Sequence, residues 1–282
     1  MRHRLRIIDD PPCGAAFNMA ADLYLLERAA AEDAVFLRFY RWAPPAISLG
    51  CMQDPGAILD HAAREKAGVS WIIRPTGGRA ILHWNDLTYS IAFPAHRQEF
   101  GRTIHESYTV ISRCLMTGLE RAGIRCESHG SSAEYAATRR DIKLPCFLSP
   151  NRNEIMVEGK KLIGSAQKRT GKAVLQHGSI PIDGSFRRLP EFCRIDETAR
   201  AAQVKMLEEK CACVREIDPA IDVQLLTTHL ITGFAATLGY ETRICSWDEI
   251  GDLSEPFRTV YMNDFKGNTT KGMVKNVKGR FQ

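Results

Sequence analysis

The sequence has no long apolar run. No stretch of about 18 or more apolar residues occurs, and a membrane-spanning helix needs at least that length. The first residues, MRHRLRIIDDPPCG, are partly basic, but the apolar segment of a secretory signal does not follow them. We therefore expect no membrane association and a cytoplasmic location.

Paired cysteine motifs are also missing. The chain has nine cysteines at irregular spacing and no Cys-x-x-Cys pair, and Cys211 and Cys213 are separated by a single residue. A disulfide framework and a structural zinc site are therefore not expected. Buried thiols in a reducing compartment are the ordinary interpretation of most of these cysteines, and we expect no bound metal.

Blocks of one charge sign are absent. The chain contains 38 Lys and Arg against 33 Asp and Glu, for a net charge of +5, and the two signs are interleaved. This distribution predicts no nucleic-acid partner, although a mildly basic protein can attract an acidic partner protein. With 44% hydrophobic and 25% charged residues, the 282 residues suit one large domain or a domain with an appendage.

Hydrophobic periodicity and turn residues predict a mixture of strands and helices. Asn18 is expected to cap a helix that runs to about Ala31, and Thr103 with Glu106 forms a capping box before another helix. Further helices are expected at 58–66 and 223–238, an edge strand at 5–8, other strands at 34–42, 46–49, 69–73, 124–127 and 240–244, and a hairpin of 80–82 with 87–93. The pattern weakens after Asp183, so we predict a main domain at 1–185 and a small, mostly helical extension and tail at 186–282.

The loop Arg74–Arg79 reads RPTGGR between two expected strands. Two adjacent glycines usually form a tight turn. Alternatively, Gly77 and Gly78 let the backbone approach a ligand while Arg74 and Arg79 supply positive charge. The residues alone leave both interpretations open.

A β-hairpin is predicted around Glu158-Gly159. On its second strand, the side chains of Lys161 and Leu162 point to opposite faces, so Lys161 can enter a pocket while Lys160 points the other way. The alternative is that both lysines lie in solvent. The small residues Gly164, Ser165 and Ala166 follow in the same strand, where a close approach of a ligand would need them.

Cys146 and the turn His177-Gly178-Ser179 flank this hairpin in the sequence. A thiol nucleophile needs access and a nearby positive charge that raises its thiolate fraction, and Lys161 could supply that charge. Because the chain has nine cysteines, the residues alone do not single out Cys146.

The strings RPTGGRAILHWNDLTYSIAF and NRNEIMVEGKKLIGSAQKR…LQHGSI together resemble the biotin/lipoate A/B protein ligase catalytic domain over roughly Leu5 to Asp183. The resemblance implies an α+β fold with a mixed β-sheet flanked by helices and an acyl pocket. It also implies that Lys161 contacts the acyl carbonyl. The substrate-binding residues that we predict are Arg74, Thr76, Gly77, Gly78, Arg79, His83, Gly164, Ser165, Ala166, His177 and Gly178.

Within that family the pattern CF-x-SP…GKK-x-x-GSAQ is most similar to octanoyltransferases of the Gram-positive type. The resemblance implies that Cys146 is the nucleophile and that, with Lys161, it carries octanoyl from acyl carrier protein to a lysine of a lipoyl domain, such as the glycine-cleavage H-type protein, without a cofactor. In the other octanoyltransferase type, the nucleophilic cysteine lies in a Pro-Cys-Gly motif. Cys193 lacks this motif, so we rank it below Cys146 as the nucleophile.

Two alternatives remain. Asn151-Arg152-Asn153 resembles a segment of the ATP-dependent lipoate-protein ligases, in which an acyl-adenylate would bind at Lys161 and the Gly77-Gly78 loop, with Cys146 as a bystander. A non-catalytic module that binds acyl carrier or lipoyl domains is the third possibility.

Overall fold

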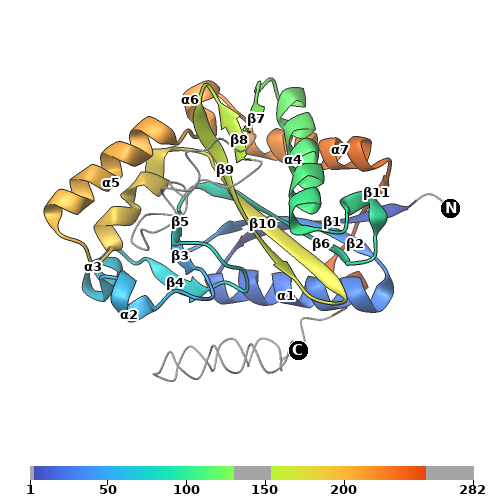
Figure 1. The fold of residues 1–282 in the computed structure, drawn as a ribbon, viewed down its shortest axis with the longest axis horizontal. Helices are drawn as coiled ribbons and strands as arrows, with labels where there is room; N and C mark the ends of the chain where they lie inside the picture. Colours follow the sequence, from blue (N-terminus) through green and yellow to red (C-terminus); the bar gives the residue numbers. More distant parts are fainter. Residues whose placement is uncertain (1–2, 130–153, 252–282) are drawn as a thin grey trace.

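The computed structural model describes residues 3–129 and 154–251. The larger of two β-sheets has helices on both of its faces (Figure 1), which confirms the expected α+β class with a mixed sheet. The elements in chain order are β1 (Arg4–Cys13), α1 (Ala15–Glu32), β2 (Val35–Trp42), β3 (Ala46–Leu49), α2 (Pro55–Ile58), α3 (His61–Lys66), β4 (Ser70–Ile73), β5 (Ile81–His83), β6 (Asp86–Pro94), η1 (Gln98–Phe100), α4 (Ile104–Arg121), β7 (Glu127–His129), β8 (Glu154–Val157), β9 (Lys160–Arg169), β10 (Ala173–Pro181), η5 (Gly184–Phe192), α5 (Glu197–Lys210), α6 (Val214–Ile217), α7 (Val223–Leu238), β11 (Glu241–Ile244) and α8 (Trp247–Ile250).

The larger sheet has eight strands in the order β11-β1-β2-β6-β10-β9-β8-β7. β1 pairs in parallel with both β11 and β2, and the other neighbours are antiparallel. The expectation of an edge strand at Leu5–Ile8 is therefore wrong, because β11 covers the free side of β1.

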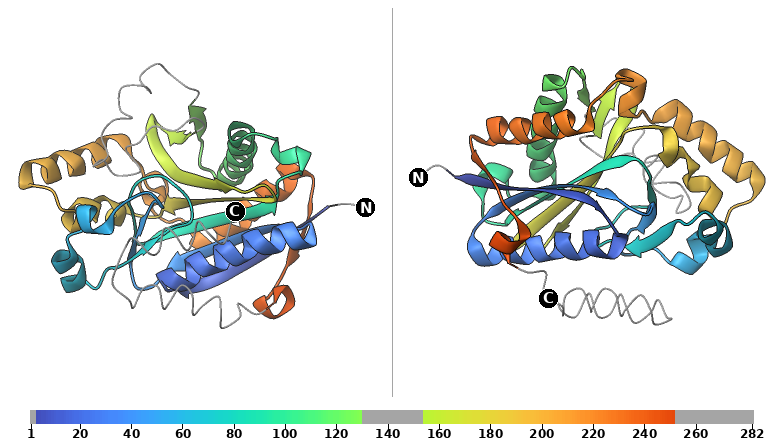
Figure 2. Two further views of the ribbon diagram at one scale, coloured as in Figure 1. Left: turned by 60° about the horizontal axis from the view of Figure 1, so that its bottom comes forward. Right: turned by 180° about the vertical axis from the view of Figure 1, so that it is seen from behind.

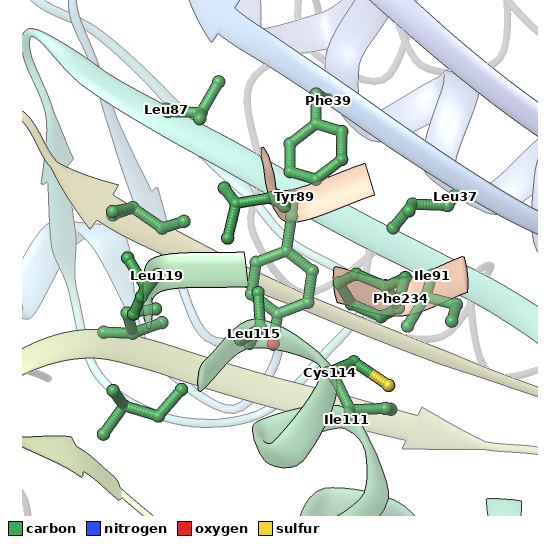
Figure 3. Close-up of a cluster of buried hydrophobic side chains, with 14 of the residues drawn as sticks. Leu37, Phe39, Leu87, Tyr89, Ile91, Ile111, Cys114, Leu115, Leu119 and Phe234 are labelled. Carbon is green, nitrogen blue, oxygen red and sulfur yellow. The ribbon is translucent and has the colours of Figure 1, made fainter. Parts of the chain in front are cut away.

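One face of the large sheet packs against α4 and α7. Alternate residues of β6 are apolar and buried in this layer, as period-two alternation requires; Figure 3 shows them beside side chains of both helices. The helices approach closely at Gly118 and Gly233, since a Cβ on Gly233 would lie 2.4 Å from the Gly118 nitrogen. The residues of this core that Figure 3 labels are Leu37, Phe39, Leu87, Tyr89, Ile91, Ile111, Cys114, Leu115, Leu119 and Phe234.

The opposite face is covered by α1, as Figure 2 shows. The helix begins at Ala15 after Gly14, so the expected N-cap at Asn18 is wrong. Asn18 is fully buried in the first turns. Its amide donates instead to the carbonyl oxygens of Cys13 and Arg41, at 3.2 and 3.1 Å. A side chain that satisfies loop and strand carbonyls is not available to cap its own helix.

A second sheet of three strands has the order β4-β3-β5. β5 pairs with β3 and not with β6, so the hairpin expected from 80–82 and 87–93 is wrong. The chain turns at Asn85, which has a positive φ of 54°, and enters the large sheet as β6. The two sheets therefore meet at the junction of β5 and β6.

Three further expectations need correction: residues 177–179, expected as a turn, lie within β10, the helix expected at 58–66 is divided into α2 and α3, and the strand expected at 124–127 begins at Glu127. Other local features are present. Thr103 and Glu106 form the capping box of α4, and Glu158-Gly159 is the turn between β8 and β9, with both residues at positive φ. Residues 186–213, weakly patterned in sequence, form η5 and α5, and Phe186, Leu207 and Cys211 bury together against Ile81 of β5. The domain division after residue 185 stays a prediction.

Within the described ranges, no helix combines the length and apolar character needed to cross a bilayer.

Candidate active site

A cleft lies where α1, the edge of the small sheet and the middle of the large sheet meet, and its space measures about 290 Å³ when the part open to solvent is counted. Six predicted binding residues line it, and seven further residues complete its wall. The predicted lining residues are Arg74, His83, Gly164, Ala166, His177 and Gly178, and the others are Met19, Tyr40, Trp42, Ser48, Ile81, Thr88 and Ser179.

His177 of β10 connects α1 to the Arg74–Arg79 loop. Its Nδ1 lies 2.9 Å from Asp22 Oδ2 and its Nε2 lies 2.7 Å from Thr76 Oγ1. Because a carboxylate only accepts, Nδ1 carries the proton and Nε2 accepts from the Thr76 hydroxyl. Burial lowers the pKa of His177, and the charges of Arg74 and His83 add to this, although Asp22 opposes it. The imidazole is thus held neutral in one tautomer.

Asp22 belongs to a buried charge cluster. Its Oδ1 accepts from Arg38 Nη1 at 3.0 Å, and Arg38 Nε donates to Asp10 Oδ2 at 2.6 Å. Burial alone would raise the pKa of Asp22, but the His177 hydrogen bond and the Arg38 charge outweigh it and hold that pKa below its usual range. Arg38, at 0% exposed, ties α1 to β1 and β2 through this cluster.

A second histidine–carboxylate pair stands across the cleft. His83 Nδ1 donates to Asp86 Oδ2 at 2.8 Å, and its Nε2 lies 2.8 Å from Ser48 Oγ. The indole of Trp42 stacks on the imidazole at 4.0 Å between ring centroids. Asp86 also accepts from Ser179 at 2.6 Å, so this pair links β5, β6 and β10.

Arg74 shapes the loop that begins with it. Its guanidinium donates to the carbonyl oxygens of Ser48, Gly77 and Arg79, at 2.9, 2.7 and 2.8 Å. The loop packs on Gly50, where a Cβ would lie 2.0 Å from the Gly78 carbonyl oxygen. These contacts give Arg74 a structural role in the turn, and the interpretation in which its charge meets a ligand stays a prediction.

The polar groups around the cleft are largely turned toward one another. The two histidines, Ser48 and Thr76 each make the bonds given above, and Thr88 Oγ1 accepts from the indole of Trp42 at 2.8 Å. Because these polar atoms are hydrogen-bonded to one another, the carbon atoms of the lining residues face the open space of the cleft. Such a wall suits an aliphatic chain better than a strongly polar ligand.

The remaining predicted binding residues lie near the cleft without lining it. Thr76 is buried and bonds to His177. Ser165 Oγ lies 2.8 Å from the hydroxyl of Tyr89, on the helix side of β6. Gly77, Gly78 and Arg79 belong to the loop outside the lining set, and their role stays a prediction.

Lys161 is 5% exposed, which rules out the alternative of a solvated lysine. Its Nζ lies 2.7 Å from Glu154 Oε1. Lys160, by contrast, reaches the outside of the hairpin and donates to the Glu208 carbonyl oxygen at 3.0 Å. The opposite directions of the two lysines match the expectation, although Lys161 is not among the residues that line the cleft.

Cys146, the predicted nucleophile, and the segment Asn151–Asn153 lie outside the described residues. Eight other cysteines are described, and all are free thiols. Burial raises the pKa of Cys193 and of Cys211 to about 11 and that of Cys114 to about 12, which makes these thiols poor nucleophiles. Cys51 lies beside the loop, where its backbone N–H bonds the Thr76 carbonyl oxygen at 2.9 Å.

Sequence reasoning missed the charged residues behind the cleft. Asp22 lies on the helical stripe of Met19 and Leu26, and Arg38 interrupts the apolar run of β2. A charge at a position that the periodicity assigns to the core was the available signal, because such charges are buried only when they are paired.

No group of three or more His, Cys, Asp or Glu side chains in the described part of the chain is placed to hold a metal ion.

Comparison with known proteins finds relatives that are similar to the chain over most of its length. Octanoyltransferase LipM of Kyrpidia tusciae is 34% identical over 240 residues, covering 83% of this chain and 87% of the relative. The LipM of Carboxydothermus hydrogenoformans is 40% identical over 206 residues, or 73% of this chain and 71% of the relative.

Among solved structures, lipoate-protein ligase A with bound ATP superposes with a TM-score of 0.72 at 20% identity, covering 95% of this chain and 97% of that one. A putative lipoate-protein ligase of Thermoplasma acidophilum with bound lipoic acid has a TM-score of 0.69 at 20% identity, covering 94% and 95%. These two likenesses show the shared fold. Residues 14–235 match the profile of the lipoyl protein ligase A/B catalytic domain, and the chain therefore belongs to that family.

Proposed function

We propose that this chain is an octanoyltransferase that takes octanoyl from octanoyl-acyl carrier protein as a thioester on Cys146 and passes it to a lysine of a lipoyl domain, such as the glycine-cleavage H-type protein. One observation carries the activity: relatives named octanoyltransferase share 34% and 40% identity with the chain over most of its length. The cysteine, the donor and the acceptor are the finer parts of the proposal.

The cleft supports an acyl substrate of this kind. An octanoyl tail has about six methylenes, and their burial contributes roughly 5 kcal/mol at about 0.8 kcal/mol each. A wall of carbon surfaces backed by paired polar groups, as around His177 and His83, can provide that burial without leaving polar atoms unsatisfied.

The proposed reaction has two steps. In the first, the Cys146 thiolate attacks the thioester carbonyl carbon, the oxyanion forms, and its collapse expels the carrier thiolate, which takes up a proton. In the second, the neutral amine of the acceptor lysine attacks the Cys146 thioester, loses its proton and releases the thiolate. The ammonium of Lys161 donates to the oxyanion in both steps, as preorganised donors do in acyl transfer. Conversion of a thioester to an amide is downhill, so the reaction needs no ATP.

The ATP-dependent ligase alternative has weaker support. The lipoate-protein ligases that superpose on the chain are about 20% identical to it, and at that identity they establish the fold alone.

Mass spectrometry of the intact protein tests the proposal. After mixing with octanoyl-acyl carrier protein, the wild type is expected to gain one octanoyl group, which is then lost to an added lipoyl domain. Cys146→Ala is expected to abolish the adduct and the transfer, whereas the matched change Cys51→Ala, at the thiol beside the loop, is expected to keep both. An adduct that persists in Cys146→Ala, or transfer that requires ATP and free octanoate, would overturn the proposal.

A further inference from the structure

The backbone of Lys161 is held from two sides. In β8 its register partner is Met156. On the other side, the Lys161 carbonyl oxygen accepts from the backbone N–H of Ala212 at 2.9 Å, and Cys211 forms a parallel bridge with Lys161. With the main chain fixed by β8 and by the segment after α5, the location of the ammonium depends on what its own side chain contacts.

A carboxylate holds that ammonium. Lys161 Nζ and Glu154 Oε1 are 2.7 Å apart, and the two side chains are only 6% and 13% exposed. Burial disfavours a charged lysine, and a carboxylate this close favours it. Glu154 is the first residue of β8, and Lys161 lies just after the tight turn that joins β8 to β9. The hairpin itself therefore brings the two side chains together.

The neighbouring thiol is not a second anion for the lysine. Cys211 is fully buried beside Lys161. Burial raises the pKa of this thiol to about 11, despite the nearby charge of Lys161, so it stays protonated at neutral pH. Among the contacts given for Lys161, the negative charge comes from Glu154.

We propose that Glu154 is a positioning residue for octanoyl transfer: it keeps Lys161 protonated and holds the ammonium where charge develops on the acyl oxygen. The inference rests on the proposed function, in which Lys161 donates to that oxygen. An ammonium has three N–H donors, so a bond to Glu154 is compatible with a further bond to the oxyanion. Because a neutral amine carries no positive charge to stabilise the oxyanion, the transfer rate follows the protonated fraction of Lys161.

The pH profile of transfer tests this role. Octanoyl transfer from octanoyl-acyl carrier protein to a lipoyl domain is measured between about pH 6 and pH 10, a range that ends near the ordinary lysine pKa. The rate of each variant is divided by the wild-type rate at the same pH, which cancels the titration of the acceptor lysine. For Glu154→Gln this ratio is expected to fall severalfold or more with rising pH, since loss of the neighbouring charge lowers the lysine pKa by about 1 to 3 units.

Two variants serve as controls. Glu158→Gln removes the same charge from the exposed turn of the same hairpin and is expected to give a ratio independent of pH. Glu154→Asp keeps the carboxylate and is expected to restore the wild-type profile with a lower rate. It also keeps the test valid if Glu154→Gln folds poorly.

A second measurement does not depend on activity. The pKa of Lys161 is followed by NMR of protein labelled with carbon-13 at the lysine side chains, with the signal assigned through Lys161→Arg. Glu154→Gln is expected to move this pKa downward, and Glu158→Gln is expected to leave it in place. An unchanged Lys161 pKa together with a flat rate ratio in Glu154→Gln would overturn the inference.

The lysine itself separates failure of this inference from failure of the proposed function. Lys161→Met is expected to lose transfer. The matched change Lys160→Met is expected to retain it, because the Lys160 ammonium donates to the Glu208 carbonyl oxygen outside the hairpin. No transfer by the wild type contradicts the proposed function, and full activity in Lys161→Met contradicts the role of Lys161 within it. Loss in Lys161→Met with a Glu154→Gln variant that behaves like Glu158→Gln contradicts only the role of Glu154.

Discussion

At the scale of single residues, the site depends on charges that are buried but paired. Asp22, Arg38 and Asp10 are each at most 6% exposed, and each is stabilised by the others and by hydrogen bonds from neighbouring elements. Removing one partner from such a set leaves an uncompensated charge, whereas the intact set orients His177 without itself touching the cleft. The histidine is thereby available as a neutral group of fixed direction.

His177 makes the stability of the protein depend on pH. Its folded-state pKa lies below the ordinary value, chiefly because of burial, so between that pKa and about 6.5 the unfolded chain binds more protons. The contribution of His177 to the free energy of unfolding should therefore be complete above about pH 6.5. Below about pH 6.5, the free energy of unfolding should fall by up to about 1.4 kcal/mol per pH unit. Urea unfolding of the wild type and His177→Gln at several pH values measures this.

The variant provides the comparison for that prediction. His177→Gln should show a smaller decrease between about pH 6.5 and pH 5, although its stability at neutral pH is lower. The depressed pKa of Asp22 acts in a more acidic window, since a lowered carboxylate pKa contributes stability that is lost only as pH falls below about 4. Equal slopes in the two proteins above pH 5 would contradict the role of His177.

At the scale of elements, one strand serves two layers. Residues of β6 that include Tyr89 point into the core under α4 and α7, while Thr88 and Ser90 point to the α1 side, where they bond Trp42 and Asp22. The strand alternation therefore separates a mainly apolar face in the core from the face that carries the site. The packing face relies on the close approach of α4 and α7 at Gly118 and Gly233.

Gly233→Ala is expected to destabilise the protein by about 1–3 kcal/mol, because a Cβ there would lie 2.4 Å from the Gly118 nitrogen and 2.6 Å from the Cys114 carbonyl oxygen. The matched change is Gly56→Ala in α2, where the Cβ would meet only Asp54 Oδ1 at an ordinary 3.5 Å. That variant should be unchanged or up to about 1 kcal/mol more stable. Chemical denaturation distinguishes them, and equal stability of both variants would mean that α7 shifts without cost.

At the scale of the whole molecule, the residues after 185 contribute to the same core as those before it. Val214, Leu226, Leu230 and Phe234 belong to the hydrophobic cluster of the large sheet. β11 adds a parallel strand beside β1, and Ala212 holds the backbone of Lys161. These contacts connect the C-terminal part to the stability of the site itself.

A chain ending at residue 185 is therefore expected to show no cooperative unfolding and no octanoyl transfer, because large apolar surfaces of the sheet would be exposed to water. A chain ending at Gly251 keeps all the contacts given above and is expected to unfold cooperatively. Thermal unfolding followed by circular dichroism measures both. A cooperative transition in the shorter chain would support an independent domain at 1–185.

Much of this protein could be predicted from its sequence. Local signals determined the capping box at Thr103, the tight turn at Glu158-Gly159 and the opposite directions of Lys160 and Lys161, because caps, turns and strand alternation depend on residues close in the chain. The motifs around the RPTGGR loop and GKKLIGSAQ also pointed to the family that the comparisons show.

Only the tertiary structure decided the rest. The pairing of β5 with β3, the cover of β1 by β11 and the burial of Asn18 depend on segments far apart in the chain. The same holds for Asp22, whose partners His177 and Arg38 come from β10 and β2. A local pattern indicates that a charge falls on an apolar face, but the free energy that keeps it there comes from partners that only folding brings together.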